Sequence, residues 1–187
     1  MLAKLIYSAI ASLDGYIADK DGGFDWAAPD DEVHAFVNDL TRPAGTHLLG
    51  RRMYEVLQAW DAVPTDDGPR VMRDFATMWQ ASDRIVYSTT LHTVSSPRTR
   101  LESRFDPDAV RELKASADRD LTVGGPGLAA VALGAGLVDE LQLFLHPVIV
   151  GGGTAALPEG IHLELELLDE RRFASGVAFL RYSCSRP

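Results

Sequence analysis

Three glycines, Gly124, Gly125 and Gly127, stand between a short apolar segment at residues 121–123 and an apolar helical pattern over residues 128–133. Glycine lets a ligand approach the backbone closely, and a helix N-terminus presents free N–H groups and a positive dipole to a phosphate. The spacing differs from the G-x-G-x-x-G fingerprint, and no acidic residue follows where a ribose contact would be expected. The segment therefore predicts either a phosphate-binding junction or a strand-to-helix turn without a ligand.

Two arginines have a similar setting. Arg51 and Arg52 follow Gly50 directly, where an apolar strand pattern over residues 46–50 gives way to a helical pattern over residues 51–58. Positive side chains oppose the dipole at a helix N-terminus, and a bound anion would relieve that conflict. The alternative is that both guanidinium groups are solvated and pair with nearby carboxylates.

A run of hydroxyl groups, Ser88, Thr89 and Thr90, follows the strand pattern over residues 84–87. Open α/β sheets bind their ligands outside the carboxyl ends of parallel strands. Taken alone, the hydroxyls suit an ordinary cap or loop. Because three strand patterns end in groups suited to phosphate, we expect them to line one edge of one crevice.

The elements that position these groups follow from hydrophobic periodicity. Strand and helix patterns alternate along most of the chain, and a Ser-Gly pair at residues 175–176 predicts a final hairpin. We therefore expect an α/β fold with a mainly parallel central sheet, helices on both faces and an antiparallel C-terminal hairpin. Strands are expected at residues 4–13, 46–50, 84–87, within 92–103, at 121–123, 138–145 with 147–150 as an extension, 162–167 and 177–183. Helices are expected from residues 29–32 until 43–45, and at 51–58, 71–80, 107–117 and 128–133.

Length and composition exclude several classes of protein. The 187 residues suit a single domain over residues 1–187, and the net charge of −9 argues against nucleic-acid binding. One cysteine, Cys184, permits neither an intramolecular disulfide nor a cysteine-based zinc site and fits a cytoplasmic protein. No stretch approaches the ~20 apolar residues of a membrane span, so no membrane partner is expected. The apolar start of the chain is interpreted as a buried first strand rather than a signal peptide.

The five histidines lack the spacing of metal ligands, so no metal is predicted. His162 falls on the wet face of an alternating pattern, and His146, directly before Pro147, is assigned a structural role. Gly151, Gly152 and Gly153 predict a bend.

Four segments together resemble the dihydrofolate reductase superfamily in their order and spacing. They are residues 12–18 (SLDGYIA), 49–55 (LGRRMYE), 86–91 (VYSTTL) and 123–127 (VGGPG). The chain is most similar to the branch that includes the C-terminal reductase domain of riboflavin biosynthesis, the RibD C-terminal domain, and residues 138–153 (VDELQLFLHPVIVGGG) also resemble that branch. In this superfamily a bend such as Gly151–Gly153 lies near the cofactor, which makes it a reserve candidate for the site. The resemblance covers essentially the whole chain and implies a dihydrofolate reductase-like fold. The zinc deaminase module that accompanies some of these reductases has no counterpart in this sequence.

The resemblance implies NADPH as the cofactor. Ile10 and Ile17 would flank the nicotinamide, and Arg51 with Ser88 and Thr89 would hold the 2′-phosphate and so favour NADPH over NADH. The residues that would contact the other phosphates are Gly50, Arg51, Arg52, Gly124, Gly125, Gly127 and Leu128. Met53 stands where the family often has a threonine that binds a phosphate, so one contact is missing there.

The resemblance also implies a carboxylate on the substrate side. Residues 26–31 (WAAPDD) resemble the segment that carries the pterin-binding carboxylate of dihydrofolate reductases, and Asp31 falls at the matching position as the candidate catalytic residue. The alternative is that the acidic residues only begin a helix. Trp26, Phe36 and Trp60 are candidate substrate-binding residues, and core packing is the alternative for each.

The implied function is an NADPH-dependent reductase that transfers a hydride to a small heterocycle, similar to a 5-amino-6-(5-phosphoribosylamino)uracil reductase. A dihydrofolate or other pterin reductase, a stand-alone reductase with another substrate, and a non-catalytic NADP-binding module stay open as alternatives. A homodimer is also expected, and an exposed apolar strand such as residues 138–145 would suit its interface.

Overall fold

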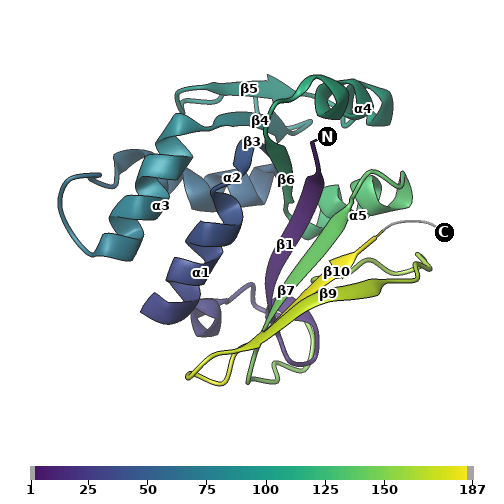
Figure 1. The fold of residues 1–187 in the computed structure, drawn as a ribbon. Helices are drawn as coiled ribbons and strands as arrows, with labels where there is room; N and C mark the ends of the chain where they lie inside the picture. Colours follow the sequence, from purple (N-terminus) through teal and green to yellow (C-terminus); the bar gives the residue numbers. More distant parts are fainter. Residues whose placement is uncertain (1–2, 185–187) are drawn as a thin grey trace.

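The computed structural model describes residues 3–184, which form an eight-stranded sheet with helices on both faces (Figure 1). The strand order is β5-β4-β3-β6-β1-β7-β10-β9, and a two-stranded ribbon pairs β2 with β8. The strands are β1 (Leu5–Ser12), β2 (Tyr16–Ala18), β3 (Ala44–Gly50), β4 (Asp83–Tyr87), β5 (Thr99–Glu102), β6 (Asp120–Gly124), β7 (Glu140–His146), β8 (Thr154–Ala155), β9 (Glu166–Arg172) and β10 (Ala178–Ser183). The helices are η1 (Asp25–Ala27), α1 (Asp31–Thr41), α2 (Arg51–Leu57), η2 (Gln58–Ala62), α3 (Arg70–Ala81), α4 (Pro107–Ser116) and α5 (Pro126–Gly134).

The strand directions confirm the expected sheet. All pairings from β5 across to β7 are parallel, whereas β10 runs antiparallel to both β7 and β9. Gly176, with a φ of 89°, lies in the turn between β9 and β10, where glycine adopts a left-handed conformation without strain. The predicted mainly parallel sheet with an antiparallel C-terminal hairpin is therefore confirmed.

Two layers of helices bury the sheet. Neighbouring residues of β3 point to opposite faces: Leu48 joins the core under α4 and α5, and Leu49 packs with Tyr54 of α2 and Trp79 of α3. Central parallel strands are covered on both sides, which explains why the predicted strand patterns read as nearly continuous apolar runs rather than alternating ones.

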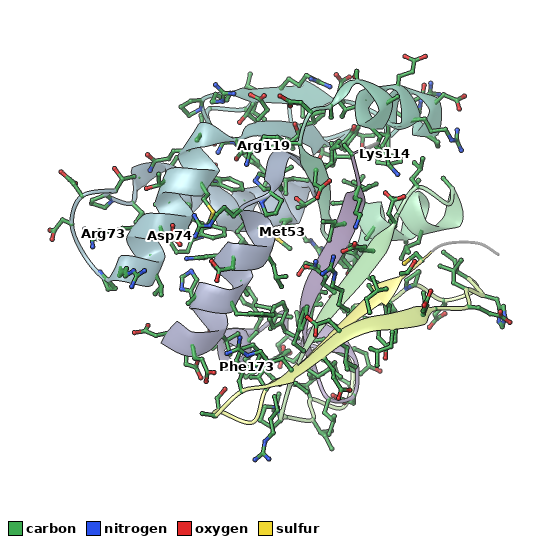
Figure 2. The ribbon with its side chains drawn as sticks, viewed as in Figure 1. Met53, Arg73, Asp74, Lys114, Arg119 and Phe173 are labelled. Carbon is green, nitrogen blue, oxygen red and sulfur yellow. The ribbon has the colours of Figure 1, made fainter. Side chains whose placement is uncertain are left out.

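Charged side chains link α1 to α3 on one face of the sheet. Asp74 lies between these helices (Figure 2) and accepts hydrogen bonds from Arg42 Nη2 at 2.9 Å and from Asn38 Nδ2 at 3.1 Å. These contacts hold the pKa of the Asp74 carboxyl below its usual value, against the opposing effect of its desolvation. The C-terminal end of α1 is thereby tied to α3.

A buried carboxylate fastens the C-terminal hairpin to the parallel sheet. Glu140 of β7 accepts hydrogen bonds from Arg181 Nε at 2.8 Å and Nη2 at 2.9 Å, and from Lys4 Nζ at 2.5 Å. Burial alone would raise the pKa of Glu140, but the two cations lower it below its usual value. The charge is therefore compensated, as a buried carboxylate requires.

Three predicted boundaries were wrong. Residues 147–150 do not extend β7, because Pro147 has no N–H to donate to a ladder and the strand ends at His146. Helix α5 begins at Pro126 rather than at residue 128, since proline is favoured in a first helical turn. The strand expected at residues 162–167 lies instead at Glu166–Arg172.

The strand proposed for a dimer interface was also wrong. Residues 140–146 form β7, which lies between β1 and β10 and has no free edge. The exposed edge strand of the C-terminal side is β9, whose seven residues are all exposed. The homodimer itself stays a prediction.

Within residues 3–184, no helix combines the length and apolar character needed to cross a membrane.

Candidate active site

The groups singled out by their spacing lie at one edge of the sheet. Strands β4, β3 and β6 are neighbours and run parallel, so the segments that follow Tyr87, Gly50 and Gly124 leave the sheet on the same side (Figure 1). Both β3 and β6 lead directly into helices, α2 and α5. This edge therefore has the position at which open α/β sheets bind ligands.

The two strand-to-helix junctions touch each other. A Cβ atom at Gly124 would lie 3.0 Å from both Leu49 Cδ2 and Met53 Cγ, so the two junctions are tightly packed against each other. Gly125 has a φ of +96°, a conformation that L side chains rarely adopt. Tight packing favours glycine at position 124, and backbone geometry favours it at position 125.

Gly127 has a different surrounding. A Cβ atom there would meet no other atom within 4 Å, so the first turn of α5 is open to an approaching group. Leu128 is half-buried beside the same junction, where its Cβ would lie 3.8 Å from a Cβ atom at Gly50. The N-terminus of α5 therefore presents accessible backbone N–H groups over a packed base.

Arg51 connects the β3 and β4 strand ends. Its Nη1 donates a hydrogen bond to Thr90 Oγ1 at 3.0 Å, and its Nε donates to Glu55 Oε1 at 2.7 Å. Ser88 Oγ accepts hydrogen bonds from the N–H groups of Thr90 and Leu91, at 3.2 and 3.0 Å. The structure thus brings Arg51 and the residue 88–90 segment together.

Three further residues, Thr90, Arg52 and Met53, complete this edge of the sheet. Thr90, rather than Thr89, contacts Arg51, and the only signal for it in the sequence was its place in the hydroxyl run. Arg52 is exposed and forms no ion pair within residues 3–184. Met53 packs against the glycine-rich junction, because its Cγ would lie 3.0 Å from a Cβ atom at Gly124.

Ile10 and Ile17 lie farther along the same edge, near the end of β1. Ile10 packs with the core under α1, whereas Ile17 of β2 packs with the core on the α5 side. The Gly151–Gly153 bend lies directly against β2, because a Cβ atom at Gly153 would be only 2.0 Å from the Ala18 carbonyl oxygen. Asp14 holds the bend by accepting hydrogen bonds from the Val150 and Gly151 N–H groups, at 3.2 and 2.8 Å.

A cavity of about 300 Å³ opens beyond the carboxyl end of β7. Strand β7 is the neighbour of β1, and Ser12 at the end of β1 pairs with His146. The cavity is lined by Trp26, Ala28, Asp30, His146, Pro147, Val148, Ser175 and Val177. Three segments far apart in the sequence form it: the loop before α1, the end of β7 and the β9–β10 hairpin.

The candidate carboxylates occupy different positions. Asp30 lines the cavity and caps α1 by accepting a hydrogen bond from the Val33 N–H at 2.8 Å. That bond, together with one from the Ser175 side chain, holds the pKa of Asp30 below its usual value. Asp31 is the exposed first residue of α1 and does not line the cavity. The catalytic role of Asp31 stays a prediction.

The three aromatic candidates are also separated. Trp26 lines the cavity and contacts the ring of His146 edge-on, with centroids 6.2 Å apart. Phe36 packs in the aromatic core near Phe173, with centroids 5.4 Å apart, and Figure 2 shows Phe173 below α1. Trp60 packs against Phe75, with centroids 4.7 Å apart. Of the three, only Trp26 therefore lines the cavity.

His146 was assigned a structural role from the sequence, but it lies on the cavity wall. The residue is 7% exposed, and its Nε2 atom has no hydrogen-bond partner. Burial lowers the pKa of His146 below its usual value, which favours the neutral ring at pH 7. Among residues 3–184, no group of three or more histidine, cysteine or carboxylate side chains is placed to hold a metal ion.

Together, the mainly parallel sheet, the antiparallel final hairpin and the glycine-rich edge define a dihydrofolate reductase-like domain. Residues 3–179 match the RibD C-terminal domain family, and the chain belongs to this family. Proteins of this family are usually reductases, and RibD-like reductases generally use NADPH.

One curated protein and two solved structures are similar to this chain, and the structures share its fold. The YyaP protein of Bacillus subtilis (strain 168) is 25% identical over 181 residues, which cover 96% of this chain and 94% of YyaP. The crystal structure of a putative riboflavin biosynthesis protein from Shewanella sp. PV-4 is similar over 100% of both chains, with a TM-score of 0.76 and 23% identity. A diaminohydroxyphosphoribosylaminopyrimidine deaminase/5-amino-6-(5-phosphoribosylamino)uracil reductase from Thermotoga maritima matches with a TM-score of 0.68 and 15% identity, over 98% of this chain and 57% of that one.

Proposed function

We propose that this protein is an NADPH-dependent reductase that transfers a hydride to a small heterocyclic substrate of the aminopyrimidine type found in riboflavin biosynthesis. The observation that carries the proposal is the packed pair of junctions at Gly50–Arg51 and Gly124–Gly125, with Arg51 bridging to the end of β4. The family to which the chain belongs supports the same assignment.

The residues of this edge fit a dinucleotide with a phosphate on its ribose. The open first turn of α5 offers N–H groups to a pyrophosphate, and Gly127 leaves room for it. Arg51 is half-exposed beside Ser88 and Thr90, so a planar guanidinium and two hydroxyls are available for a 2′-phosphate. When bound, NADPH supplies the hydride.

The chain's own residues have separate tasks in this proposal. Arg51, Arg52 and the α5 N-terminus bind and orient the phosphates, and Ile10 and Ile17 provide the apolar walls for a nicotinamide. The substrate occupies the space between that position and the cavity at His146, because β1 and β7 end side by side. A carboxyl group at the start of α1 delivers the proton that accompanies the hydride.

A non-catalytic NADP-binding module is the second candidate. It is favoured by the placement of the carboxylates: Asp31 is exposed, and Asp30 is already engaged as a helix cap with a lowered pKa. A group with a lowered pKa is deprotonated at neutral pH and is a poor proton donor. The two candidates differ in turnover rather than in cofactor binding.

Replacing Asp31 with asparagine separates them. We expect Asp31→Asn to lower the rate of NADPH oxidation in the presence of 5-amino-6-(5-phosphoribosylamino)uracil by about 100-fold, because positioned acids contribute about that much, while NADPH affinity is unchanged. The rate is followed by the loss of nicotinamide absorbance, and 7,8-dihydrofolate serves as the parallel substrate.

The matched control is Asp30→Asn, because asparagine caps a helix as well as aspartate does. A wild-type rate in Asp31→Asn with a loss in Asp30→Asn would move the proton donor to Asp30. Absence of NADPH oxidation by the wild-type protein with either substrate would favour the binding module.

A further inference from the structure

One ring nitrogen of His146, Nε2, is buried without a hydrogen-bond partner. Burial lowers the pKa of His146 and so favours the neutral ring. In a neutral imidazole one nitrogen donates and the other accepts, so an unprotonated Nε2 is a hydrogen-bond acceptor without a donor.

A second unpaired polar atom belongs to the same wall. Trp26 Nε1, which can only donate, is also buried without a partner, and the two rings meet edge-on across the cavity wall. Buried polar groups in proteins nearly always have hydrogen-bond partners, so two unpaired nitrogens at one cavity indicate that a ligand pairs with them. One acceptor and one donor are complementary to a molecule that offers an N–H and a C=O.

The charges on the cavity wall limit the chemical class of ligand that can bind there. Asp30 and His146 are the titratable residues on its wall, and no lysine or arginine lines it. A phosphate would meet the Asp30 carboxylate without a compensating cation, so the cavity suits an uncharged ring rather than an anionic group. Arg51 and Arg52 follow β3, and two strands, β6 and β1, separate β3 from the β7 strand end at the cavity.

We propose that His146 determines substrate specificity: its Nε2 accepts a hydrogen bond from a ring N–H of a cyclic amide, while Trp26 Nε1–H donates to the ring carbonyl. This inference rests on the proposed function and assigns the recognition of its substrate. Neither nitrogen is reached by solvent in the structure described, so the proposal requires the Trp26 side chain to turn away from His146 when the ring enters.

The test uses 5,6-diaminouracil as the probe and its 1,3-dimethyl derivative, which lacks both ring N–H groups. Calorimetric titrations are made on the wild-type protein and on His146→Phe, which keeps an aromatic ring but removes the acceptor. We expect the wild type to bind the probe at least about ten times more tightly than the dimethyl compound, as one hydrogen bond to a buried acceptor implies. In His146→Phe the preference shrinks to about twofold or less, because the acceptor is gone.

His146→Gln is the rescue variant, since its side-chain oxygen can accept in place of Nε2, and it should restore most of the preference. Equal preferences in the wild type and His146→Phe would overturn the proposal, as would failure of the wild type to bind the probe at all. Thermal unfolding and an NADPH titration on each variant show that the fold and the strand-end site are intact. If the wild-type protein prefers the probe over its dimethyl derivative but does not bind NADPH, the proposed function is contradicted and the role of His146 is not.

Discussion

Replacing Arg51 with alanine is expected to weaken NADPH binding by at least about tenfold and to leave NADH binding within about a factor of two. Hydrogen bonds from a guanidinium to a phosphate are among the stronger ones in water, and only NADPH carries the 2′-phosphate. The guanidinium is already held near the end of β4 by Thr90, at 3.0 Å. Fluorescence titration with both nucleotides measures the two affinities.

The neighbouring Arg52 provides the control for this variant. Arg52→Ala removes the same charge one residue along, from a side chain with no ion pair in the described part of the chain, and should weaken both nucleotides alike. The ion pair between Arg51 and Glu55 is about half-exposed and contributes little to stability, so Arg51→Ala should remain folded. Equal losses of NADPH and NADH in Arg51→Ala would place Arg51 on the pyrophosphate.

The largest effect on stability is expected at Arg84, whose side chain is 0% exposed. Its Nη1 donates to the Trp79 carbonyl at 2.7 Å and its Nε donates to Thr99 Oγ1 at 3.0 Å, and the guanidinium lies 4.5 Å from the centre of the Trp79 ring. Arg84→Leu removes these hydrogen bonds and the 3.4 Å ion pair with Asp61, and should cost about 3 kcal/mol of unfolding free energy. Thermal unfolding should show a fall in Tm of roughly 10 °C.

Arg100→Leu is the matched substitution on the neighbouring strand. Arg100 forms an exposed pair with Glu102 at 3.3 Å, and such pairs contribute about 0–1 kcal/mol. Its Tm should stay within roughly 3 °C of the wild type. Similar Tm values for Arg84→Leu and Arg100→Leu would show that the buried guanidinium is not needed for stability.

The sequence predicted those parts of the fold that depend on local chemistry. Apolar periodicity identified the parallel strands, acidic residues marked the start of α1, and the Ser-Gly pair marked the final turn. The same kind of reasoning found the Gly50–Arg51 and Gly124–Gly125 junctions, because glycines and arginines directly after strands are local signals.

The errors have physical causes that lie outside local sequence. Residues 161–165 alternate as a strand would, because Ile161 and Leu163 pack on the core, but the segment forms no ladder. Three segments from distant parts of the chain form the cavity at His146, so residue spacing in the sequence does not predict it. That His146 Nε2 has no partner follows only from the three-dimensional surroundings of the ring.

The most direct test of the central claim is a fluorescence titration of the wild-type protein with NADPH and with NADH under identical salt and pH. The arrangement of Arg51, Ser88 and Thr90 beside the open first turn of α5 predicts saturable binding of both nucleotides, with NADPH bound at least about tenfold more tightly. If NADPH binds no more tightly than NADH, the proposed 2′-phosphate site at the ends of β3 and β4 is contradicted. If neither nucleotide binds, the proposal that the protein is an NADPH-dependent reductase is contradicted.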